Sequence, residues 1–172
     1  ASSSASASAS ASASASASKS ATAGARPPGG WPGPGNTGPG STKLSSYGGP
    51  CTITAARTVI EAKTINCDLL IKATGVVIRK SKVNGRVNTD DRGAYSVTIE
   101  DTEINAGTQR FPAVAYSNVT VVRSNIHGGQ TSVLCVKSCT IRDSWLHGQY
   151  MPPGADWHLD AFLMNGGSDA TL

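Results

Sequence analysis

Two histidines occupy equivalent places in this sequence, because His127 and His147 lie 20 residues apart and a glycine follows each. Imidazole changes its charge near neutral pH, so two neighbouring histidines can move protons or grip a substrate. Two histidines alone rarely complete a metal site. They can also belong to a polar ladder that caps a turn, and the sequence leaves both interpretations open.

The segment 148–157 carries groups suited to sugars. It contains Tyr150 and Trp157, whose rings can stack on a sugar face, and the carboxylate of Asp156. An insertion of this kind in one repeat of a solenoid forms a surface loop, often on the binding face. We therefore expect these three residues to contact a substrate.

His158 and Asp160 follow this segment directly. A carboxylate such as Asp160 can act as an acid or base on a glycosidic bond, and glycoside hydrolysis requires a second carboxylate as well. The candidates for that second group are Asp156 and Asp143, with a residue beyond Leu172 as the alternative. His158 and Asp160 join the two earlier histidines as candidate catalytic residues.

An elimination reaction on a uronate polymer needs a different set of groups. A basic side chain removes the proton next to the carboxylate, and a cation such as Ca²⁺ or arginine neutralises the developing charge. His127 and His147 are candidate bases, and Arg123 and Arg142 are candidate substrate ligands. No cofactor is evident, and Ca²⁺ would have a role only in a lyase, although the sequence has no dense acidic cluster to bind it.

The elements that must position these groups are repeats of a short unit. Each unit contains one aligned apolar residue, and the intervals between successive ones are 21, 22, 20 and 31 residues. A period of about 21 residues built from β-branched runs is typical of a solenoid. Helical stripes and the leucines of leucine-rich repeats are missing, which leaves an all-β parallel β-helix with like residues stacked about 4.8 Å apart. The aligned residues are Ile78, Ile99, Val121, Ile141 and Leu172.

Each unit is predicted to form a strand, a corner and a second short strand, preceded by a third strand. The corner holds a serine or threonine. The second strand ends in an apolar residue and then a polar one, and since alternate residues of a strand face opposite sides, the polar residue should point outward. The corner residues are Ser81, Thr102, Ser124 and Ser144, and the outward column is Asn84, Asn105, His127 and His147.

The chain divides into three parts by composition. Residues 1–25 alternate serine and alanine and are predicted to be a disordered linker, which could tether additional modules. Residues 26–50 are rich in glycine and proline and should cap the open end of the β-helix, with Trp31 and Leu44 as stoppers. Alternatively, Trp31 stacks on a sugar. Residues 51–172 form the β-helix.

The four cysteines favour two disulfides and an oxidising compartment. Proximity in the sequence favours the pairs Cys51–Cys67 and Cys135–Cys139. A buried thiol at Cys139 is the alternative, because this residue occupies a column that otherwise holds core valines.

The charge pattern argues against two classes of partner. The net charge of +4 is spread over the chain, so a nucleic-acid partner is not expected. There is also no long apolar run that would suggest a membrane protein. A mild attraction for acidic polysaccharide remains compatible with the excess of positive charge.

The entry segment and the coil endings together match a known pattern. They read Trp31-Pro32-Gly33-Pro34, Asn36-Thr37-Gly38, Leu44, Thr58-Val59-Ile60, Asn84-Gly85, His127-Gly128-Gly129, Ser144-Trp145-Leu146-His147-Gly148 and His158-Leu159-Asp160-Ala161-Phe162. Over residues 31–172 the sequence resembles the pectate-lyase-like superfamily of bacterial and fungal proteins. That resemblance implies a right-handed parallel β-helix, secretion, and action on polysaccharide as a lyase or glycosidase.

The last of these motifs is also similar to the Asn-Thr-Asp-Gly strand of polygalacturonase-type glycosidases, in which the aspartate is a catalytic acid. Asp160 occupies the matching position, but His158 and Ala161 depart from the pattern. A non-catalytic carbohydrate-binding or surface β-helix is the alternative function. An ice-binding surface is disfavoured, because Val77 interrupts the short column of Thr98, Thr120 and Thr140.

Overall fold

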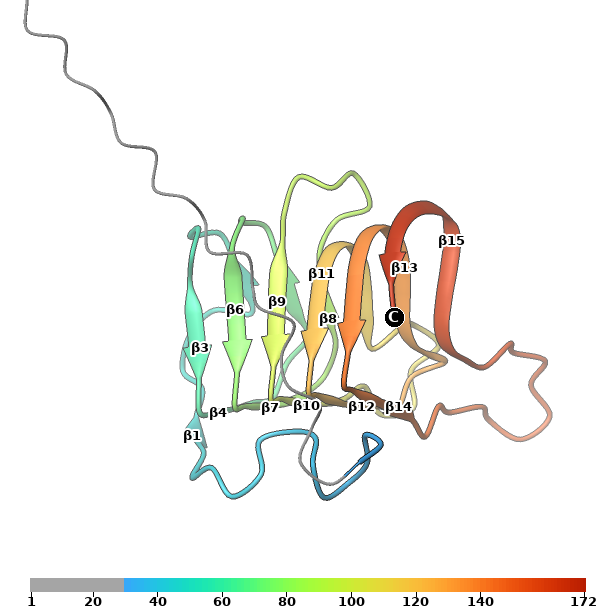
Figure 1. The fold of residues 1–172 in the computed structure, drawn as a ribbon, viewed down its shortest axis with the longest axis horizontal. Helices are drawn as coiled ribbons and strands as arrows, with labels where there is room; N and C mark the ends of the chain where they lie inside the picture. Colours follow the sequence, from blue (N-terminus) through green and yellow to red (C-terminus); the bar gives the residue numbers. More distant parts are fainter. Residues whose placement is uncertain (1–29) are drawn as a thin grey trace, which may run out of the picture.

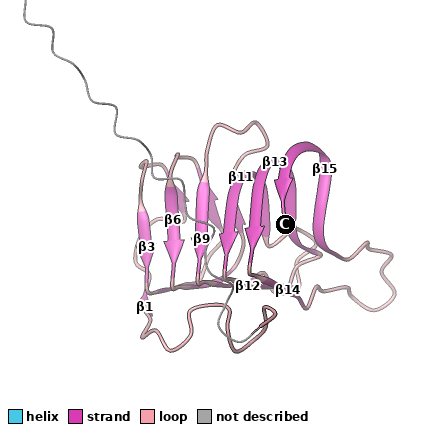
Figure 2. Ribbon diagram, viewed as in Figure 1, coloured by secondary structure: helices cyan, strands magenta, loops and turns pink. Residues whose placement is uncertain are grey.

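The computed structural model describes residues 30–172, which form a parallel β-helix (Figure 1). Every strand pair within this range is parallel, and Figure 2 shows strands and loops but no helix there. The all-β solenoid predicted from the repeats is therefore confirmed. The predicted linker of residues 1–25 lies outside the described residues.

One wall of the β-helix is a six-stranded sheet, here called sheet A. Each coil contributes one strand of two or three residues to it, and its neighbours come from the coils before and after. The strands are β1 (Ser45–Ser46), β4 (Lys63–Ile65), β7 (Lys82–Asn84), β10 (Glu103–Asn105), β12 (Asn125–His127) and β14 (Trp145–His147).

The other two walls belong to a second sheet, called sheet B. In the early coils each of these two walls has its own short strand. In the later coils one long strand runs through both walls: β11 pairs with β8 through its first residues and with β9 through its last. Each coil thus has the three predicted strand segments. The strands are β2 (Thr52–Ile53), β3 (Val59–Glu61), β5 (Leu69–Ile71), β6 (Val76–Arg79), β8 (Val87–Asn88), β9 (Val97–Glu100), β11 (Val114–Val122), β13 (Thr131–Arg142) and β15 (Asp160–Thr171).

The predicted aligned column is confirmed by the strand register. Ile78 pairs with Ile99, Ile99 with Val121 and Val121 with Ile141, and all four side chains are buried. The column reaches the last coil through the pairing of Thr140 with Thr171, but the next residue, Leu172, is 76% exposed. The core is therefore a stack of small branched side chains, each covered by its equivalents in the neighbouring coils.

The predicted hydroxyl corner forms a buried ladder along the start of sheet A. Each backbone N–H of the ladder donates to the hydroxyl one coil further on at 3.1–3.3 Å, and each hydroxyl donates to the carbonyl two residues earlier at 2.7–2.9 Å. The residue before each hydroxyl has positive φ, which allows the tight bend at some steric cost. These residues are Lys80, Asp101, Arg123 and Asp143, and Ala62 has the same conformation at the equivalent place in the preceding coil, before Lys63.

Both disulfides join the pairs favoured by proximity. Cys51 bonds to Cys67, and Cys135 bonds to Cys139. Cys139 occupies the valine column, in register with Val119, and is fully buried. The alternative of a buried free thiol is therefore wrong, although its premise that this cysteine faces the core is correct.

The N-terminal segment 30–44 runs along the outside of sheet A (Figure 1). The Gly38 N–H donates to the Arg123 carbonyl at 2.9 Å, well away from the first coil. Trp31 is 84% exposed and lies beside Trp145 in the last coil, so its predicted role as a stopper for the N-terminal opening is wrong. Tyr47 is the aromatic that packs against the core near Ile53 at that end.

The long last interval contains the predicted surface loop. Thr131 follows His127 after three residues, whereas its partner Asp160 follows His147 after twelve, so most of the extra residues lie in the loop between β14 and β15 (Figure 1). The remaining two lie in a bulge near Gly166, whereas the sequence predicted all of them in the loop. Within residues 30–172 no helix is long and apolar enough to cross a membrane.

Candidate functional site

A row of polar side chains lies on the outer face of sheet A, where its strands end. The register places Asn84, Asn105, His127 and His147 in successive coils. The two imidazole rings are stacked, with centroids 5.3 Å apart and an angle of 24° between their planes. The prediction that these histidines become neighbours on one outer face is confirmed, and we call this column the amide–histidine row.

Glu103 joins the row from the neighbouring outward column. Its Oε1 lies 3.2 Å from His127 Nε2 and 2.9 Å from Lys82 Nζ. Partial burial tends to raise the pKa of Glu103, but the hydrogen bonds and charges of Lys82 and His127 outweigh it and lower the pKa. Glu103 is therefore an ionised carboxylate held against an imidazole.

His147 has a different environment in the next coil. Its ring stacks on Trp145 with centroids 3.5 Å apart, and its Nε2 lies 2.8 Å from Asn125 Oδ1. Partial burial lowers the pKa of His147, and the charge of His127 adds to this effect while Glu103 opposes it. A histidine with a lowered pKa is neutral at physiological pH and can accept a proton.

Glu103 was missed in the sequence, although a signal for it existed. Lys82, Glu103, Asn125 and Trp145 form the outward column two residues before the amide–histidine row. Alternate residues of a strand share a face, so a search of both outward columns would have identified the carboxylate beside the histidines.

A groove of about 380 Å³ adjoins the amide end of the row. Its polar lining includes the side chains of Asn84 and Asn105, together with Asp68 and the loop 106–109. Asn84 donates to Asn66 at 2.7 Å, which continues the row into the preceding coil. Amides along a groove offer both donors and acceptors to a polar ligand.

The second predicted pair, His158 and Asp160, lies at the start of a different wall, with His158 in the loop just before β15. Asp160 begins β15 of sheet B in register with the buried Thr131, and the His158 carbonyl accepts a hydrogen bond from Gln130 at 2.9 Å. The two histidines of the row belong to sheet A. The four residues predicted to form one catalytic surface thus come from two walls, and the geometry of the site rests on the pair in sheet A.

The loop residues Tyr150 and Trp157 lie together. Their rings meet edge to face at 6.3 Å, and Arg110 from another coil lies 5.8 Å from the Trp157 centroid. Asp156 is exposed beside them. These residues were predicted to bind substrate, and the loop does present them as a group at the surface.

The side chains of Arg123 and Arg142, predicted to bind substrate, are partly buried within the protein. Arg123 makes a two-point ion pair with Asp101 at 2.7 and 2.9 Å, and this hydrogen bonding raises the Arg123 pKa. Arg142 Nε is buried without a hydrogen-bond partner among residues 30–172. Asp143 lies at the hydroxyl corner, at the opposite end of the sheet A strand from the amide–histidine row.

Neither a metal site nor a similarity to known proteins helps to assign a role to these residues. Within residues 30–172, no group of three or more His, Cys, Asp or Glu side chains is arranged to hold a metal ion. No family model matches the chain, and neither a curated protein nor a solved structure matches it. The amide–histidine row must therefore be interpreted from its own chemistry.

Proposed function

We propose that this chain is a secreted carbohydrate-active protein of the pectate-lyase-like type that cleaves acidic polysaccharide by elimination. The observation that carries the proposal is the row itself, in which a neutral imidazole, a second imidazole and an ionised carboxylate stand side by side on an outer face. Two disulfides support the secreted setting, because such bonds persist in oxidising compartments.

In this proposal His147 is the base. It removes the proton on the carbon next to the uronate carboxylate, the electron pair forms the new carbon–carbon double bond, and the glycosidic oxygen leaves. His127, which faces Glu103 at 3.2 Å, supplies a proton to that oxygen. Lys82, which lies 2.9 Å from Glu103, provides positive charge for the uronate carboxylate by sharing its ammonium group between the two, and added Ca²⁺ is the alternative source.

Elimination is favoured over hydrolysis by the arrangement of carboxylates. Hydrolysis requires two carboxyl groups facing one bond, about 5 to 9.5 Å apart. Asp160 begins a strand of sheet B, Asp156 lies in the loop before it, and Asp143 lies at the hydroxyl corner before β14, so none of the three belongs to the amide–histidine row. The row offers one carboxylate and two imidazoles, which suits proton abstraction better.

The test uses the full chain with polygalacturonate, alginate and a neutral polymer, with and without Ca²⁺. The unsaturated uronate product is followed by its ultraviolet absorbance. The variants His127→Asn and His147→Asn place in these coils the amide that Asn84 and Asn105 already supply, so the wall should persist. Each should lower turnover about 100- to 10,000-fold, the usual contribution of a general acid or base.

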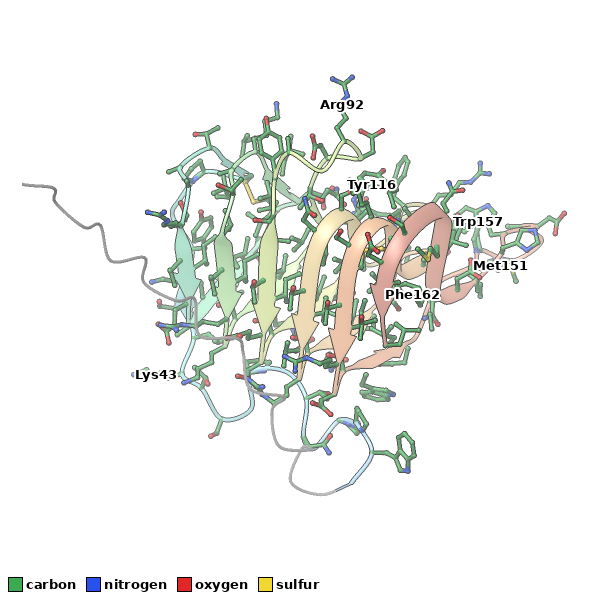
Figure 3. All side chains as sticks on the ribbon, turned by 45° about the horizontal axis from the view of Figure 1, so that its top comes forward. Lys43, Arg92, Tyr116, Met151, Trp157 and Phe162 are labelled. Carbon is green, nitrogen blue, oxygen red and sulfur yellow. A yellow bond between two sulfur atoms is a disulfide. The ribbon has the colours of Figure 1, made fainter. Side chains whose placement is uncertain are left out.

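The exposed Arg92 lies away from the row, at the tip of the loop between β8 and β9 (Figure 3), and Arg92→Ala is the control that should keep full activity. New reducing ends without the unsaturated product would indicate a hydrolase, in which case Asp160→Ala should abolish turnover. Retention on the polymer without any product would make the chain a binding module. Either result would overturn the proposed elimination.

A further inference from the structure

A second pocket lies at the last coil, beyond the histidine end of the row. Its volume is about 410 Å³, within the range of small-molecule sites. It lies between the N-terminal segment, which contributes Trp31 and Pro32, and β14, which contributes Trp145 and Leu146. Phe162 of β15 completes the aromatic lining (Figure 3). Two segments that are far apart in the sequence therefore build one aromatic pocket.

The lining has one charged residue, Asp143, among largely apolar neighbours. The adjacent Ser144 hydroxyl already donates to the Arg142 carbonyl at 2.8 Å and accepts from the Ser124 N–H at 3.1 Å. Asp143 is thus the group with acceptor capacity to spare for a ligand. Indole faces combined with one carboxylate suit a ligand that has an apolar face and hydroxyl groups at its rim.

Trp145 connects this pocket to the row. One face of its indole stacks on His147 at 3.5 Å, and the residue also lines the pocket. A glycan that passes the two histidines would reach the pocket with its next residues. Trp145 and His147 belong to the same strand, so Trp145 joins the histidine end of the row to the pocket.

We propose that this pocket is a sugar-binding subsite that takes a neutral sugar residue of the glycan, a proposal that rests on the proposed function. The sugar ring stacks against Trp145 and Trp31, and Asp143 accepts hydrogen bonds from its hydroxyls. A uronate in this pocket would bring its carboxylate towards Asp143, and like charges at close range repel. The charge of Arg123 also acts on Asp143, but Arg123 is already paired with Asp101. The polymer recognised is therefore acidic at the row and neutral at the pocket.

The experiment measures intrinsic tryptophan fluorescence of the full chain during titration with short glycans. Neutral β-linked oligosaccharides should change the emission, and Trp31→Ala should weaken their binding about tenfold, since stacking on an aromatic ring is worth about 1 kcal/mol or more. Trp31 is 84% exposed, so the substitution should leave the fold intact. Asp143→Asn should weaken binding of neutral glycans and relax the discrimination against oligogalacturonate.

Val59→Ala supplies the matched control, because Val59 is an exposed apolar residue of the first coil and should leave binding unchanged. No emission change with any neutral glycan would overturn the subsite, even if turnover on uronate polymers is observed. A response to tetramethylammonium but not to glycans would also overturn it, since an aromatic pocket with a carboxylate can hold a cation. Self-association that disappears in Trp31→Ala would assign the pocket to a second copy instead.

Binding to the subsite and turnover at the row are separate measurements. If His147→Asn abolishes turnover while glycan binding persists, both proposals stand. If glycans bind through Trp31 but no polymer is cleaved, the subsite stands and the elimination fails.

Discussion

Two polar ladders flank the same short strands of sheet A, and they differ in almost every physical respect. The hydroxyl ladder at the start of the strands includes Thr102 and Ser124, is buried, and bonds to backbone N–H groups of the adjacent coil. The amide–histidine row at the other end is partly exposed, and its contacts are made between side chains. The same sequence repeat thus provides a column of residues that stabilises the fold and, at the other end of the same short strands, a column whose side chains are available for chemistry.

The comparison predicts that the hydroxyl ladder stabilises the fold far more than the row. Thr102→Val keeps the side-chain shape but removes the acceptor for the buried Ser81 N–H. Leaving that group unsatisfied should lower the free energy of unfolding by about 1–3 kcal/mol. Urea unfolding followed by circular dichroism measures the change.

The matched variant in the other ladder is Asn84→Ala, which removes an exposed hydrogen bond to Asn66. Its effect on the free energy of unfolding should stay within about 0.5 kcal/mol, as is usual for surface substitutions. Equal losses in the two variants would show that the ladders do not differ as described.

A second prediction concerns pH. The pKa of His147 is lower in the folded chain than the ordinary histidine value of about 6.5. As the pH falls through that value, His147 therefore takes up its proton more readily in the unfolded chain than in the folded one. The stability contributed by the neutral ring is fully present above that value and is lost as pH falls through the folded pKa. Wild-type protein should therefore lose more stability than His147→Asn between about pH 7.5 and about pH 5.5.

Urea unfolding at both pH values checks this prediction. This pH range excludes the titration of Glu103. The lowered pKa of Glu103 also makes stability fall as pH falls, but only at pH values below the ordinary carboxyl range. If the wild type and the variant lose stability equally, the neutral imidazole inferred for the row is wrong.

A smaller change in stability is predicted at the bend beside the hydroxyl ladder. Ala62 has φ of 54°, a conformation that glycine adopts without strain. Ala62→Gly should raise the free energy of unfolding by up to about 1 kcal/mol, seen as a higher melting temperature. The exposed Ala56 lacks this conformation, so Ala56→Gly should be neutral or destabilising, and a gain there would contradict the explanation.

Much of the wall could be predicted because its residues repeat. The register of Ile78, Ile99 and Val121, the hydroxyl corner and the neighbouring histidines all follow from side chains that recur at one period. Stacking makes residues one period apart into neighbours, so the sequence interval itself carries the spatial information.

The rest of the site lacked such a period. The path of Trp31 was mispredicted, because a Gly/Pro segment has no alternation that fixes what it contacts. Asp160 was assigned to the histidine surface by likeness of motif, whereas the register puts it on another wall. Glu103 was overlooked because its partner His127 lies one coil away in a different column.

The loop between β14 and β15 leaves the pairing on either side of it undisturbed. His147 still matches His127 before the loop, and Asp160 still matches Thr131 after it. The scaffold therefore tolerates a change in loop length at this corner without losing its rungs. New specificities could arise here by insertion alone, since the cost of lengthening falls on the loop and leaves the stacked core as it was.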